Sequence, residues 1–145
     1  MYFVDREKIE EMLTFMDQQL AQIQAYPEIS TPLQQAAIER WTHIVIEAIL
    51  DVGNSMIDGF IMRDPGSYED IVEILTDEKV ITEAMSAELK RIVSYRKMLV
   101  QQYTKVDHEL ILKHFHQHMQ TLTSFSTNVR EYLTHELGPV SAFRN

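Results

Sequence analysis

The 145-residue chain has no cysteine, only four glycines and only four prolines. Without cysteine it has no disulfide, no thiolate metal ligand and no cysteine nucleophile. The glycines and prolines gather at four places, whereas a β-sandwich or barrel needs a turn about every ten residues. We therefore expect a few long helices and a reducing compartment.

Long apolar runs are also missing. No segment approaches the roughly 20 apolar residues of a membrane-spanning helix. The first residues, 1–7, carry acids where a secretory signal needs a basic region. Hydrophobic residues make up 45% of the chain and charged residues 24%, as in ordinary globular proteins. We expect a cytoplasmic protein with no membrane partner, folded as one domain over residues 1–145.

Apolar residues recur at spacings of three and four in five segments, which capping and turn signals separate. Helices of such length joined by short connections pack as an antiparallel, up-and-down bundle. The sequence therefore predicts an all-α bundle of about five helices. The predicted helices cover residues 5–25, Pro32 to about Met62, a short helix after Ser67, Thr82 to about Tyr103, and Asp107 to the stop pair Gly138-Pro139.

The second predicted helix carries a polar stripe on an otherwise apolar segment. Its residues lie at steps of three and four, so they share one helical face. The stripe is either the solvent face of the helix, or a cleft-facing row in which Glu47 or Asp51 orients an arginine from a neighbouring helix. The residues are Arg40, His43, Glu47, Asp51, Asn54 and Asp58.

Three histidines alternate in the last predicted helix, at His114, His116 and His118. The first and third lie one turn apart, which is a metal-ligand spacing, but no side chain one turn further along the helix is a suitable third ligand. We expect surface or interface histidines, and we predict neither a metal nor another cofactor.

Charge is distributed unevenly. The net charge is −9, yet residues 88–105 hold five basic residues against Glu88 alone. Such a segment is either a solvated helix surface or the basic footprint that phosphate binding needs.

Within this segment, Arg96 and Tyr103 lie seven residues apart. In a continuous helix they share one face about 10 Å apart, with Gln101 about 140° around the axis from Arg96. They could line two walls of a groove. Alternatively, they are the polar ends of a packing helix.

The segment resembles the motif of HepT-like proteins in the HEPN ribonuclease superfamily: an arginine, four residues, a histidine, one residue and a tyrosine. The resemblance extends over nearly the whole chain, from an acid followed by an asparagine on the second helix to an acidic helix start after the motif. The matching residues are Asp51, Asn54, Pro65, Ser67, Tyr68, Leu75, Val80-Ile81, Leu89, Arg96, Leu99-Val100, Tyr103 and Val106-Asp107.

This resemblance implies a homodimer whose motif helices line a shared cleft. Family members that cut RNA without metal use the 2′-hydroxyl as nucleophile, the arginine to hold the phosphate and the histidine to move protons. The family partner is a minimal nucleotidyltransferase antitoxin that adenylylates the motif tyrosine, here Tyr103.

The chain departs from the motif twice, with Lys97 in place of Asn or Asp and Gln101 in place of the histidine. Glutamine cannot carry a proton near neutral pH, so a rate contribution of about 10² to 10⁴ should be missing. His108 is close in sequence but begins the next helix.

The resemblance thus predicts a toxin component of a toxin–antitoxin pair with poor cleavage, or an inactive module that binds RNA, nucleotides or another protein. The candidate catalytic positions are Arg96, Gln101 and Tyr103. Phosphate is expected at Arg96 and Lys97, with polar support from Glu47, Asp51 and Asn54.

Overall fold

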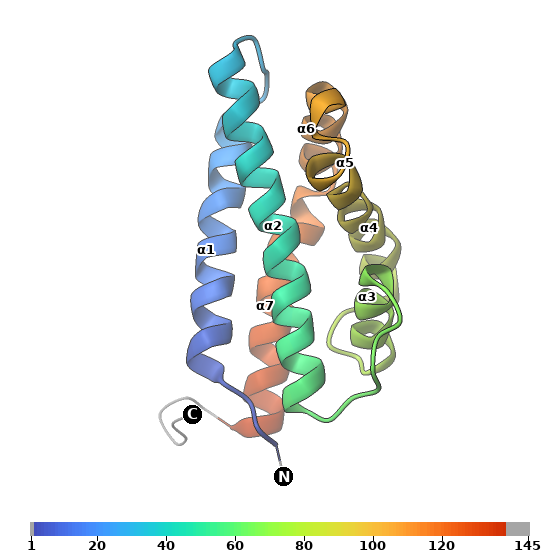
Figure 1. Ribbon diagram of the computed structural model, residues 1–145. Helices are drawn as coiled ribbons and strands as arrows, with labels where there is room; N and C mark the ends of the chain where they lie inside the picture. The colour runs from blue at the N-terminus through green and yellow to red at the C-terminus, as the bar shows by residue number, and fades with distance from the viewer. Residues whose placement is uncertain (1, 139–145) are drawn as a thin grey trace.

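The structure is a computed structural model that describes residues 2–138 (Figure 1). No strand occurs in this part of the chain, and the predicted all-α fold is confirmed. The elements are α1 (Arg6–Ala25), α2 (Pro32–Gly59), α3 (Tyr68–Asp77), α4 (Glu83–Ser94), α5 (Arg96–Val100), the 3-10 helix η1 (Tyr103–Lys105), α6 (His108–Gln117) and α7 (Met119–Leu137).

Side-chain caps fix where most of these helices begin. Asp5, Thr31, Ser67, Thr82 and Asp107 each accept a hydrogen bond from a backbone N–H in the first turn of the helix that follows. Such a cap stabilises a helix by about 1 kcal/mol. The start signals that the sequence predicts are therefore confirmed.

Helix α2 is the central element of the bundle. Its 28 residues span about 42 Å, and it packs against α1, α3, α4, α5 and α6. In Figure 1, α1 and α2 run side by side, with α3 to α6 on the other side of α2. One continuous core joins the helices, and α2 contributes Ile38, Val45, Ile46, Ile49, Val52, Met56 and Ile57 to it.

Helix α3 approaches α2 very closely at Gly53. A β-carbon added to Gly53 would lie 2.4 Å from Cγ2 of Ile71, a buried side chain on α3. The missing side chain therefore sets the distance between the two helices, and with it the position of Tyr68 at the start of α3.

Two predicted helix ends are wrong. Helix α2 ends at Gly59 rather than near Met62, because Ile61 adopts a left-handed backbone with φ of 57°. Helix α4 ends at Ser94 rather than near Tyr103. The Ser94 hydroxyl donates to the Arg91 carbonyl, a bond that competes with the helical ladder, and the short α5 follows.

The long last helix is also interrupted, at His118, which separates α6 from α7. No glycine or proline marks the break. Instead, His118 Nδ1 lies 2.5 Å from Glu88 on α4, so a tertiary contact holds the side chain where the helix changes. Pro139, the second residue of the predicted stop pair, lies outside the described residues.

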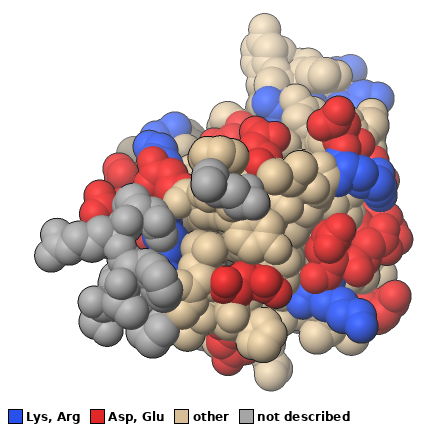
Figure 2. All heavy atoms as spheres, turned by 90° about the horizontal axis from the view of Figure 1, so that it is seen from below, with Lys and Arg blue, Asp and Glu red and all other residues tan. Residues whose placement is uncertain are grey.

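The helices of residues 2–138 include none with both the length and the apolar character to cross a membrane. Figure 2 shows the bundle from below. On this face, the acidic and basic side chains of the described residues are interspersed around an uncharged area and form no continuous basic surface.

Candidate functional site

Arg96 begins α5 and points to the polar stripe of α2. Its Nε donates a hydrogen bond of 2.6 Å to Glu47 Oε1. The side chains of Arg96 and Glu47 are 22% and 30% exposed, so the pair is partly shielded from water. The hydrogen bond that Arg96 donates to Glu47 is the main cause that raises the pKa of the Arg96 guanidinium. The arginine is therefore a fixed cation.

Tyr68, the first residue of α3, supports the same guanidinium from one face. The Arg96 Cζ atom lies 4.6 Å from the centroid of the Tyr68 ring, which is cation–π geometry. Three elements, α2, α3 and α5, thus meet at one cation. Within residues 2–138, the hydrogen bond and the ion pair of Arg96 both use Nε. The two Nη atoms remain available, and such a planar pair matches two oxygens of a phosphate.

His43 lies one turn before Glu47 on α2. Its Nε2 is 3.4 Å from Glu47 Oε1, the same oxygen that accepts from Arg96. The imidazole and the guanidinium are therefore neighbours across one carboxylate. The His43 side chain is 35% exposed, so solvent reaches it.

Asp51 lies one turn after Glu47. Its pKa is raised above the usual range, first because partial burial disfavours the carboxylate and second because Glu47 repels it, while Arg96 and Lys8 act in the opposite direction. Asn54, the next stripe residue, is exposed.

The other motif positions make no polar contact with Arg96 within residues 2–138. Helix α5 ends at Val100, so Arg96 and Tyr103 do not share one helical face, and that prediction is wrong. Lys97, Gln101 and Tyr103 are all exposed, with 67% of Tyr103 accessible. None of them makes a hydrogen bond or an ion pair with Arg96, whose only such partner in residues 2–138 is Glu47.

Glu39, which lies one turn before His43 on α2, contacts α6. His108 Nε2 lies 2.8 Å from Glu39 Oε2. Glu39, His43, Glu47 and Asp51 follow one another at steps of four residues, so one face of α2 presents them in a row. The sequence allows either a solvent face or a row that orients an arginine of a neighbouring helix. The second interpretation is correct for Glu47, which binds Arg96 of α5.

The three alternating histidines have three different partners. His114 is buried and its Nδ1 contacts the hydroxyl of Tyr95, His116 Nε2 lies 3.4 Å from the Tyr26 carbonyl oxygen, and His118 pairs with Glu88. Burial is the main cause that lowers the pKa of His114. In residues 2–138, no three His, Asp or Glu side chains are arranged to hold a metal ion.

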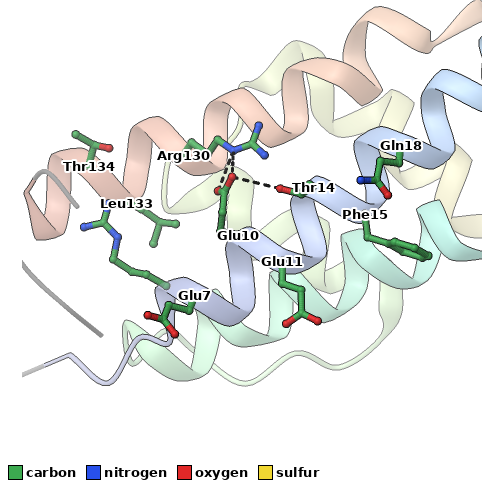
Figure 3. Close-up of a pocket in the computed structure, with 10 residues that line it drawn as sticks. Glu7, Glu10, Glu11, Thr14, Phe15, Gln18, Arg130, Leu133 and Thr134 are labelled. Carbon is green, nitrogen blue, oxygen red and sulfur yellow. Dashed lines mark hydrogen bonds and ion pairs between the residues drawn. The ribbon is translucent and has the colours of Figure 1, made fainter. Parts of the chain in front are cut away.

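A groove of about 810 Å³ lies on another side of the bundle, between α1 and α7 (Figure 3). Arg130 lines this groove. Its Nε donates to both carboxylate oxygens of Glu10, at 3.1 and 3.0 Å. Its Nη1 donates to Asp17 at 3.3 Å. Glu7 and Glu11 also line the groove. These carboxylates make the groove unsuitable for a phosphate.

Two residues of the Arg96 site were not predicted. Tyr68 was noted only as part of a helix start, and no local pattern indicates that its ring lies under Arg96. His43 was noted as one member of the stripe. Its position four residues before Glu47 was the available signal.

Known proteins match this chain over most of its length. The family model described as "Ribonuclease HepT-like" matches residues 6–129. YutE of Bacillus subtilis (strain 168), a candidate RNase by its name, is 51% identical over 144 residues, which are 99% of this chain and all of YutE.

Solved structures give the same result. The structure of YutE, described as a cytosolic protein of unknown function, superposes with a TM-score of 0.94 over 99% of this chain and 100% of that chain. A tri-AMPylated HEPN toxin of Shewanella oneidensis, in complex with an MNT antitoxin, has a TM-score of 0.75 at 20% identity, over 85% of this chain and 96% of that one. The second likeness concerns the fold alone. On the family match and the identity to YutE, the chain belongs to the HepT-like ribonuclease family.

Proposed function

We propose that this chain is a toxin-type HepT-like component that binds the phosphate of RNA or a nucleotide at Arg96. The observation that carries the proposal is the state of the Arg96 guanidinium. Glu47 holds its Nε and Tyr68 lies against its face, while no hydrogen bond within residues 2–138 uses either Nη atom. A cation oriented in advance in this way loses little side-chain entropy when an anion binds.

Charge near Arg96 supports the same proposal. Lys97 and Lys105 lie on the exposed segment that includes α5 and η1, and they add positive potential where a phosphate would bind. The chain as a whole carries a net charge of −9, so an RNA strand is repelled elsewhere. Binding should therefore be local and should weaken as salt rises.

Cleavage is expected to be poor. Gln101 can donate a hydrogen bond to a phosphate but cannot move a proton near neutral pH. The second candidate function, an inactive module that binds RNA, nucleotides or a protein, is favoured by this residue and by the exposed position of the segment around it.

A partner is part of the proposal. The Shewanella oneidensis relative is an AMPylated toxin in complex with its MNT antitoxin, and we propose a nucleotidyltransferase of this kind as the partner of this chain. With 67% of its surface accessible, Tyr103 could receive an adenylyl group. We also propose a cytoplasmic location, a single domain over residues 1–145, and a homodimer whose motif segments line a shared cleft. Light scattering tests the dimer, and a monomer at micromolar concentration would contradict it.

The phosphate site is tested by RNA binding. Fluorescence anisotropy with a labelled single-stranded RNA in EDTA should give an affinity that Arg96→Ala lowers at least about tenfold, as expected for a charged contact. Arg130→Ala is the matched control, because it also removes an arginine that pairs with carboxylates. Equal affinities of the Arg96→Ala variant and the parent would refute the site.

A further inference from the structure

We propose that His43 carries the proton that Gln101 cannot, so that the chain retains slow, metal-independent RNA cleavage. This inference rests on the proposed phosphate site at Arg96. It assigns a catalytic role to a helix α2 residue that lies outside the arginine-to-tyrosine motif.

The geometry around Glu47 carries the inference. His43 Nε2 and Arg96 Nε both lie within reach of Glu47 Oε1, at 3.4 and 2.6 Å. A phosphodiester held by the Nη atoms of Arg96 therefore lies beside the imidazole. Because His43 is 35% exposed, a ribose hydroxyl of the bound strand can reach it.

Glu47 also suits the imidazole to act as a base. When Nε2 carries its proton toward the carboxylate, Nδ1 is left as the acceptor, and the 3.4 Å contact of His43 with Glu47 uses Nε2. A carboxylate behind an imidazole stabilises the imidazolium that forms when the other nitrogen takes a proton.

The step balances as an internal transfer of the phosphoryl group. The 2′-oxygen forms a bond to phosphorus while the bond from phosphorus to the 5′-oxygen of the next nucleotide breaks. His43 Nδ1 takes the proton of the 2′-hydroxyl. The leaving 5′-oxygen takes a proton from water, and the imidazolium then neutralises the hydroxide. The products are a 2′,3′-cyclic phosphate and a 5′-hydroxyl end.

The other titratable groups near the stripe are less suitable. His108 pairs with Glu39, two turns of α2 before Glu47, so it does not share a carboxylate with Arg96. Asp51 does lie near Arg96, but a carboxylate is a weaker base than an imidazole. His114 is buried against Tyr95 and cannot contact an RNA strand.

The test is RNA cleavage in EDTA by the full chain, with the cyclic phosphate ends measured. We expect slow cleavage that His43→Gln lowers at least about tenfold, while RNA binding stays within about twofold of the parent. His116→Gln, purified in the same way, is the matched control for a contaminating ribonuclease and should cleave at the parent rate.

The same His43→Gln substitution in a Gln101→His protein makes the test specific. In a Gln101→His protein, His43→Gln should cost less than about threefold, because the motif histidine then moves the proton. Parent-like cleavage by His43→Gln, or no cleavage by a parent that binds RNA through Arg96, would overturn the role of His43 and leave the phosphate site standing. Loss of Arg96-dependent binding would instead overturn the phosphate site.

Discussion

Arg96 on α5 and Arg130 on α7 are two arginines that pair with carboxylates in different ways. Arg130 uses Nε and Nη1 on Glu10 and Asp17, inside a groove with further acids (Figure 3). Arg96 uses Nε alone, on Glu47, and rests on an aromatic ring. The first arrangement neutralises the cation, and the second orients it for an anion. The groove at Arg130 is therefore not the better candidate for a phosphate site.

The largest expected effect comes from restoring an imidazole to the motif. Gln101→His should raise metal-independent RNA cleavage at least about tenfold, because it returns a proton carrier to the segment that begins with the oriented Arg96. The measurement is a single-turnover gel assay in EDTA.

Thr134→His is the control for this gain, since it adds an imidazole to the groove near Arg130. It should not change the rate. An equal gain from both variants would mean that the position of the imidazole is irrelevant. It would contradict the functional difference between the Arg96 and Arg130 sites.

The next effect concerns the distance between α2 and α3, which places Tyr68. Gly53→Ala should lower the free energy of unfolding by about 1–3 kcal/mol, because the new methyl group overlaps the buried Ile71 side chain. Urea denaturation measures this loss. Gly66→Ala is the control, because its β-carbon meets only Asp70 Oδ2 at 3.7 Å. Equal losses would show that Gly53 does not set the helix spacing.

A smaller effect should appear in the pH dependence of stability. The pKa of Asp51 is raised in the folded state above its ordinary value of 3.8, so the ionised carboxylate disfavours folding at neutral pH. Asp51→Asn should therefore stabilise the protein at pH 7, and the gain should vanish as the pH falls through the raised pKa toward 3.8.

The ionised carboxylate of Asp70 has the opposite effect on stability. The hydrogen bond from Arg63, aided by the Gly66 N–H, lowers its pKa from 3.8 to about 2. Asp70→Asn should destabilise the protein at pH 7, with the loss shrinking between pH 3.8 and about 2. Thermal melts across this range measure both variants, and parallel curves for the two would contradict the assignment.

The smallest effect is expected at Arg130. Its ion pairs lie at the surface, where such pairs contribute about 0–1 kcal/mol. Arg130→Ala should shift the urea midpoint only slightly. If Arg130→Ala lowered the free energy of unfolding by several kcal/mol, these ion pairs would instead be a major source of stability.

The sequence predicted the fold well because its signals are local. The caps at Thr31, Ser67, Thr82 and Asp107 and the apolar spacing place most helix starts correctly. The breaks at Tyr95 and His118 were missed for two reasons: a bond from Ser94 to the Arg91 carbonyl competes with the helical ladder at the first, and contacts distant in sequence accompany both. Tyr95 meets His114, and His118 meets Glu88, and neither break has a glycine or proline.

The site was predictable only in part, for the same reason. Arg96 and Glu47 stood out as a motif residue and as a stripe residue that could orient an arginine. That Arg96 rests on Tyr68, and that His43 shares its carboxylate, depends on how α2, α3 and α5 pack. The end of α5 at Val100 also means that Arg96 and Tyr103 do not share one helical face, which the spacing in an unbroken helix could not reveal.

The most direct test of the phosphate site follows the guanidinium groups themselves. In an NMR titration of the full chain with adenosine 5′-monophosphate, the Nη resonances of Arg96, assigned through Arg96→Lys, should shift and saturate. Those of Arg130 should stay in place. A saturating shift at Arg130, or none at Arg96 up to millimolar nucleotide, would contradict the account.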